Sequence, residues 1–168
     1  MKNLIVYYSM NGNTDYVAQK VSSIINADLL RISPKEAFPD KGIKKFFWGG
    51  KSAVMGETPE LEEYTFNSDM YDHIIIGTPI WAGTMAPPIR TFIVDNKNKL
   101  VTKKISVYCT HSGGGGEKAI RKIKELLGEI PLANTLVVVE PKDKPSDESE
   151  LKITEFCDKF HFIKEEIK

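Results

Sequence analysis

The chain has 168 residues, and its 23 lysines and arginines balance 23 aspartates and glutamates, so the formal net charge at pH 7 is zero. This length suits one domain, 1–168, that buries a core without cross-links. The even charge balance argues against the strongly basic surface of a typical nucleic-acid-binding protein. No apolar run is long enough to span a membrane. We therefore expect neither nucleic acid nor membrane among the partners.

The first predicted strand, at about Leu4–Tyr8, leads into a polar loop and then into residues with helical apolar spacing. The loop consists of Ser9, Met10, Asn11, Gly12, Asn13 and Thr14. Hydroxyl and amide donors beside a helix N-terminus indicate phosphate binding. The loop lacks the lysine of a P-loop and the glycines of the dinucleotide fingerprint, so both are excluded. We predict an uncharged cradle for one terminal phosphate, and the helical spacing that follows disfavours the alternative of a hairpin turn at Asn11-Gly12.

Further apolar strands are predicted at Asp28–Ile32, His73–Gly77, Ile105–Cys109 and Thr135–Val139. Helical patterns separate most of these runs, and we read the charged linker 140–150 as a solvated connection. This alternation predicts an α/β fold of three layers, with helices covering both faces of a doubly wound, five-stranded parallel sheet.

Two more loops follow the ends of predicted strands, where open α/β sheets bind ligands. The second loop exposes an indole beside a flexible peptide, and its candidate binding residues are Thr78, Pro79, Ile80, Trp81, Ala82 and Gly83. The third loop carries four glycines, which allow close approach to a flat ligand, and its candidates are Thr110, His111, Ser112, Gly113, Gly114, Gly115 and Gly116. Together the three loops can hold a phosphate, a polyol chain and an aromatic ring system.

These three motifs, in this order, resemble the flavin-binding loops of the flavodoxin family, and the chain is similar to its short-chain members over nearly its whole length. The first loop resembles the family's [ST]xTGNT sequence. The resemblance implies the strand order 2-1-3-4-5, noncovalent FMN, and redox chemistry carried by the flavin with no catalytic side chain and no metal. It also implies that the Ala82-Gly83 peptide can flip to offer its carbonyl to the reduced flavin, and His111 is a candidate partner for the ring's pyrimidine edge.

The chain departs from the family in having no net acidic charge and no aromatic residue in the third loop. Our first functional expectation is an electron carrier, whose partner is a redox protein or a small electron acceptor. An NAD(P)H-dependent quinone or flavin reductase is the alternative, favoured by the neutral charge and the thinly covered ring. A flavin-free binding domain is a third class. We expect a monomer or a dimer.

The stretch 33–67 is predicted to be a lid-like insertion in which lysines 41, 44, 45 and 51 alternate with aromatic residues. It is interpreted either as a lid or docking surface beside the flavin, or as a helix whose aromatic residues cover the sheet while its lysines reach solvent, and the second interpretation is favoured. Gly49, Gly50 and Gly56 are predicted to break the helical pattern.

The two cysteines, Cys109 and Cys157, lie in separate apolar runs and are predicted to be reduced core residues. No apolar signal-peptide core follows Lys2. Both features predict a cytoplasmic protein.

Overall fold

The computed structural model describes residues 1–38 and 42–162, without the side chains of residues 42–48, 161 and 162. Five parallel strands are hydrogen-bonded in the order β2-β1-β3-β5-β6, and the two-residue β4 pairs antiparallel with β3. The strands are β1 (Asn3–Tyr7), β2 (Asp28–Arg31), β3 (His73–Trp81), β4 (Thr84–Met85), β5 (Lys104–His111) and β6 (Asn134–Val139). With β4 set aside, this is the predicted order 2-1-3-4-5, so the predicted topology is confirmed.

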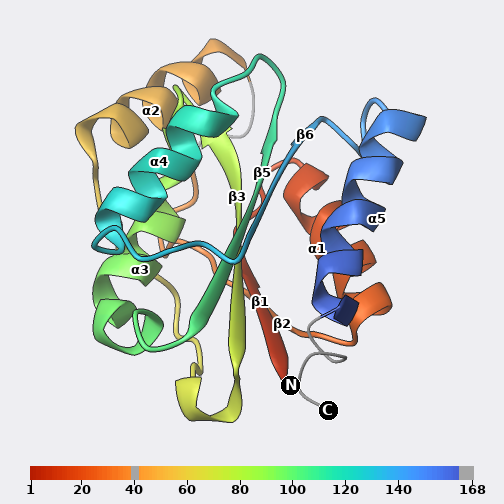
Figure 1. Cartoon of the computed structure of the whole chain (residues 1–168). Coiled ribbons are helices and arrows are strands. Elements are labelled where there is room, and N and C mark those ends of the chain that lie inside the picture. Colours follow the sequence, from red (N-terminus) through yellow and green to blue (C-terminus); the bar gives the residue numbers. More distant parts are fainter. Residues whose placement is uncertain (39–41, 163–168) are drawn as a thin grey trace.

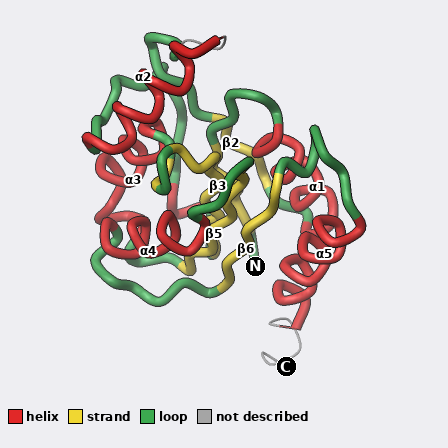
Figure 2. The backbone as a smooth tube through the Cα atoms, turned by 90° about the horizontal axis from the view of Figure 1, so that it is seen from above, coloured by secondary structure: helices red, strands yellow, loops and turns green. Residues whose placement is uncertain are grey.

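Helices cover both faces of the sheet (Figure 1). They are α1 (Asn13–Ile25), α2 (Gly42–Met55), α3 (Pro87–Leu100), α4 (Gly116–Leu126) and α5 (Asp147–Phe162), with a short 3-10 helix at Ser68–Met70. Figure 2, seen from above, places α1 and α5 on one side of the strands and α2, α3 and α4 on the other. In the described ranges, no helix combines the length and apolarity needed to cross a bilayer.

Successive residues of each strand point to opposite faces of the sheet, so they contribute to two separate apolar cores. On β3, Ile74 and Ile76 point into the core under α3 and α4, while Ile75 points into the core under α1 and α5. All three are fully buried, as expected for a parallel sheet sandwiched between helices. Cys109 and Cys157 are free and buried as predicted, and burial raises the pKa of each thiol to about 12.

The third strand is longer than predicted, because it continues past Gly77 into a hairpin. Ile80 pairs with Met85 and Trp81 with Thr84, so the residues from Thr78 to Trp81 form strand and not loop. Ala82 and Gly83 then make the turn with φ angles of 49° and 73°. Positive φ at both central residues is the signature of a type I′ hairpin, whose twist matches that of the flanking strands.

The insertion contains α2, and the predicted break at Gly49 and Gly50 is wrong because both lie inside this helix. Gly56, with φ of 69°, follows its end. A Cβ on Gly49 would lie 3.2 Å from the Trp81 ring, so the missing side chain lets α2 approach the second loop closely. Lys41 falls outside the described residues, as do the side chains of Lys44 and Lys45, while Lys51 is exposed.

Candidate functional site

A cleft of about 570 Å³ opens at the carboxyl ends of β1, β3 and β5. Chain order reverses around β1, which lies between β2 and β3, and open α/β sheets bind ligands at such a switch point. The residues around the cleft are Ser9, Met10, Asn11, Asn13, Thr14, Gly50, Pro79, Ile80, Trp81, Ala82, Gly83, Thr110, His111, Ser112, Gly113, Gly114 and Glu140. The fold therefore brings the three predicted loops to one place.

Four predicted residues, Gly12, Thr78, Gly115 and Gly116, do not line the cleft. Thr78 is fully buried, and its hydroxyl accepts a hydrogen bond from the Ala86 amide at 3.0 Å. A Cβ on Gly116 would lie 2.5 Å from Val137, and one on Gly115 would lie 3.0 Å from the Cα of Gly83. These residues shape the backbone that carries the lining residues.

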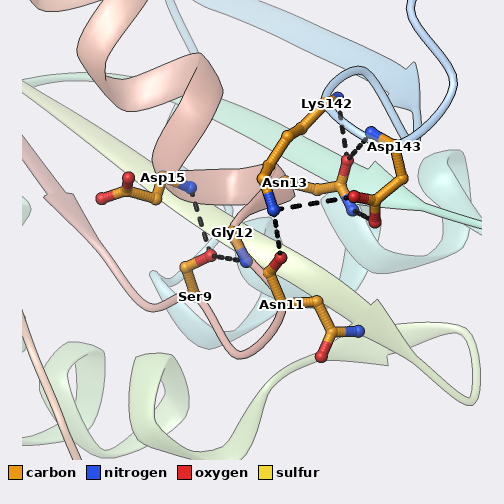
Figure 3. A network of polar contacts seen from close by, with 7 residues as sticks. All are labelled: Ser9, Asn11, Gly12, Asn13, Asp15, Lys142 and Asp143. Atoms are coloured by element: carbon orange, nitrogen blue, oxygen red, sulfur yellow. Dashed lines mark hydrogen bonds and ion pairs between the residues drawn. The ribbon is translucent and has the colours of Figure 1, made fainter.

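Side chains of the first loop are engaged in holding the loop itself. The Ser9 hydroxyl oxygen accepts hydrogen bonds from the amides of Gly12 (3.1 Å) and Asp15 (3.2 Å) (Figure 3). Both lone pairs of that oxygen are then used, so the role left to this hydroxyl is that of a donor. Thr14 shares a 2.8 Å hydrogen bond with the hydroxyl of Thr110. The amides of Asn13 and Thr14 begin α1 and lack acceptors four residues earlier in the helix, so they offer an anion site.

The prediction of an uncharged cradle is wrong, because two cations reach the loop from distant segments. The Lys142 ammonium lies 3.2 Å from the Asn11 carbonyl oxygen, and the Arg31 guanidinium lies 3.0 Å from that of Ser9. The linker after β6 is likewise not merely solvated, since the Asn13 amide oxygen accepts a 2.9 Å hydrogen bond from the Lys142 backbone amide. Both contacts of Lys142 join residues far apart in the chain, so local spacing carries no sign of them.

Trp81 forms one wall of the cleft and is held from several sides. Its ring meets those of Tyr8 and Phe38 edge-on, with centroids 5.8 Å and 5.1 Å away. Gly49 of α2 lies against the indole as well. Such edge-to-face contacts favour a fixed ring orientation, so the wall is preformed.

His111 and Glu140 are adjacent in the lining of the cleft. The Nδ1 atom of His111 accepts a 2.8 Å hydrogen bond from the Gly114 amide, which requires a neutral ring with its proton on Nε2. Burial lowers the pKa of this imidazole, and the nearby Glu140 carboxylate opposes that shift. The Glu140 amide donates to the His111 carbonyl at 3.0 Å, and its carboxylate lies 2.5 Å from the Lys144 ammonium.

Glu140 and Gly50 are lining residues that the sequence analysis missed. Glu140 directly follows β6, so the rule that ligands gather beyond strand ends could have found it. Gly50 lies in α2, and no local signal places that helix beside the cleft.

The type I′ turn bears on the expected flip of the peptide between Ala82 and Gly83. Flipping that peptide converts a type I′ turn into type II′, which strongly prefers glycine at its first central position. This chain has alanine there, with φ already at 49°. The observed turn therefore disfavours the flip that the resemblance implied.

The fold and the cleft define the class: an open parallel α/β protein with a cleft built by the loops after its central strands. The chain belongs to the flavodoxin family, since the family model described as flavodoxin matches residues 2–146.

Solved structures agree with this assignment. A flavoprotein from Lactobacillus acidophilus NCFM, solved in complex with FMN, is 25% identical, with a TM-score of 0.71 over 84% of this chain and 95% of that one. Oxidised flavodoxin 1 from Bacillus cereus is 18% identical, with a TM-score of 0.57 over 95% of this chain and 97% of that one. Two-electron reduced Megasphaera elsdenii flavodoxin is also 18% identical, with a TM-score of 0.59 over 94% and 96%. The last two likenesses concern the fold.

Proposed function

We propose that the cleft binds FMN noncovalently and that the protein works as an electron carrier. The observation that carries this proposal is the meeting of three loops, from segments far apart in the chain, around one cleft at the switch point of the sheet. Family membership and the FMN-bound relative support the choice of cofactor.

The residues around the cleft fit FMN in size and in chemistry. Its volume of about 570 Å³ lies within the range of small-molecule sites, roughly 300 to 1,000 Å³. The amides at the start of α1 and the Ser9 hydroxyl suit a phosphate, and the Trp81 wall suits a flat ring. A Cβ added to Gly113 or Gly114 would meet none of the described atoms within 4 Å, so the third loop leaves room beside such a ring.

When bound, FMN supplies the redox chemistry, and the protein positions it. The α1 end and Ser9 hold the phosphate, Trp81 orients the ring, and the 2.8 Å hydrogen bond from Gly114 to His111 fixes the loop opposite. Gly50 of α2 lines the cleft, so this part of the insertion lies beside the proposed flavin site. That position supports the role of the insertion as a lid. Two buried, unpaired cysteines suit a reducing cytoplasm.

The charge of the lining favours a carrier over a reductase. Of the described residues that line the cleft, Glu140 alone carries a formal charge at neutral pH, since His111 is held neutral. The two cations at the first loop, Lys142 and Arg31, contact backbone carbonyls there, beside the proposed phosphate site, and neither is among the lining residues. A pyridine nucleotide brings several phosphate charges, and cationic side chains are their usual partners. The open space beside Gly113 and Gly114 favours the alternative, an NAD(P)H-dependent quinone or flavin reductase, because a substrate could approach the ring there.

Stopped-flow reduction of the FMN-loaded protein separates the two functions. A carrier lacks a site that holds the nicotinamide in position, so we expect NADH and NADPH to bleach the flavin slowly and without saturation. A flavodoxin reductase should reduce it rapidly in the same buffer. Saturable bleaching by either nucleotide at roughly 1 to 1,000 per second, the range of ordinary turnover, would replace the carrier with the reductase.

A further inference from the structure

The segment after β6 clasps the first loop through side chains and backbone alike (Figure 3). The Asn13 amide nitrogen donates a 2.7 Å hydrogen bond to the Asp143 carboxylate, and its amide oxygen accepts one from the backbone amide of Lys142. The Lys142 side chain then passes over Gly12, where an added Cβ would lie 3.0 Å from the ammonium nitrogen. The clasp therefore places a cation directly on the loop.

The peptide between Asn11 and Gly12 is fixed at both ends by this arrangement. Its carbonyl oxygen lies 3.2 Å from the Lys142 ammonium, and its N–H donates to the Ser9 hydroxyl at 3.1 Å. An ammonium carries three donors, and the Asp143 carboxylate, at 3.7 Å, is beyond direct hydrogen-bond distance. Lys142 thus retains donors for a further acceptor, and its side chain is half exposed.

The other charged groups at the loop do not duplicate this role. The Arg31 guanidinium approaches from β2 and contacts the Ser9 carbonyl. The Asp15 carboxylate accepts a 2.7 Å hydrogen bond from the Tyr7 hydroxyl. Among the residues that the structure describes, Asp143 carries the carboxylate that competes directly for the Lys142 ammonium.

We propose that Lys142 is the counter-charge for the cofactor's phosphate and that Asn13 and Asp143 position it. The inference rests on the proposed FMN site. It assigns the choice of FMN over riboflavin to a lysine that lies 131 residues beyond the loop carbonyl it contacts. A charge-assisted hydrogen bond to a phosphate is stronger than a neutral one. Because riboflavin has no phosphate, the ammonium of Lys142 should strengthen the binding of FMN and not that of riboflavin.

Affinities for FMN and riboflavin, measured by flavin fluorescence quenching, test the assignment. Lys142→Met should weaken FMN binding by about 10- to 100-fold, the value of one hydrogen bond to a charged group, and leave riboflavin binding unchanged. Lys142→Arg should keep the FMN preference. Added salt should reduce that preference in the natural protein and have little effect on it in Lys142→Met.

Asp143→Asn should change the affinity for FMN in the opposite direction. An asparagine can still accept the hydrogen bond from Asn13, but it no longer competes for the ammonium. FMN should therefore bind more tightly to this variant, with riboflavin again unchanged. The matched control is Lys124→Met, which removes the same charge from a half-exposed lysine paired with Glu129 near the end of α4. It should alter neither affinity.

The outcomes separate the two proposals. If the natural protein binds neither flavin, the proposed function fails. If it binds FMN, but Lys142→Met weakens both flavins equally or neither, the assignment of Lys142 is overturned. An equal loss of FMN affinity in Lys124→Met would also overturn it, because the effect would then be that of general surface charge.

Discussion

At the scale of single residues, His73 shows how burial ties an ionisable group to stability. The side chain is fully buried, shares a 2.8 Å hydrogen bond between Nε2 and the Ser106 hydroxyl, and stacks on Phe160 with centroids 4.8 Å apart. Burial, with a smaller contribution from the positive charge of Lys104, lowers the pKa of this imidazole from 6.5 to about 4. The folded protein therefore keeps His73 neutral under conditions in which the unfolded chain protonates it.

His73 should make the protein sensitive to mild acid. Its contribution to stability is complete above pH 6.5 and is lost as the pH falls toward 4, because the unfolded state binds the extra proton in that window. From pH 7.5 to 4.5, it should lower the free energy of unfolding by about 2 to 3 kcal/mol.

Urea unfolding at several pH values checks this, with His73→Gln as the comparison. The variant should be less stable throughout, since it loses the stacked ring, but its stability should change less between pH 7.5 and 4.5. Equal pH dependence in the two proteins would assign the acid sensitivity to other groups.

At the scale of elements, the contact of α2 with the hairpin of β3 and β4 links the insertion to the cleft. Gly49 lies against the Trp81 ring, whereas the contact of a Cβ on Gly50 with the described side chains would be to the Ala82 Cβ, at 3.9 Å. Both glycines lie inside the helix, where alanine is intrinsically preferred by roughly 0.5 to 1 kcal/mol. The two positions thus form a matched pair with different surroundings.

Gly50→Ala should raise the free energy of unfolding by about 0.5 to 1 kcal/mol, because its new methyl group makes an ordinary contact. Gly49→Ala should not raise the free energy of unfolding in this way, because its Cβ would lie 3.2 Å from the indole and must displace it. Displacing the wall should also weaken flavin binding. Thermal unfolding and flavin titration measure both effects. An equal gain in stability, with unchanged flavin affinity in Gly49→Ala, would mean that α2 does not position Trp81.

At the scale of the whole molecule, the cleft draws its lining from segments spread over most of the chain, from Ser9 to Glu140. Global unfolding must therefore release the cofactor. FMN at about 100 times its dissociation constant should then stabilise the protein by roughly 2.7 kcal/mol, the value that mass action gives for binding to the native state alone. Denaturant unfolding with and without FMN tests this, and a midpoint unaffected by FMN would contradict binding at a site that requires the whole fold.

The sequence by itself determined the parallel sheet and the three loops that meet at the cleft, whereas the order of the strands was implied by the resemblance to the flavodoxin family. Apolar periodicity and residues such as Trp81 are local signals, and the topology of parallel strands places their loops at one edge. The family match supports FMN, the cofactor expected from those loops. The roles of individual lining residues remain predictions, as does the lid.

Only the tertiary structure decided what surrounds those loops. The Lys142 ammonium meets the carbonyl of Asn11 across 131 residues, and the α2 backbone reaches Trp81 because Gly49 has no side chain. Gly49 and Gly50 look like a helix break in the sequence, because the Trp81 ring that explains Gly49 lies on another element. Contacts between distant segments leave no periodicity in a single chain, so the charge on the cradle and the support of its aromatic wall depend on the folded arrangement.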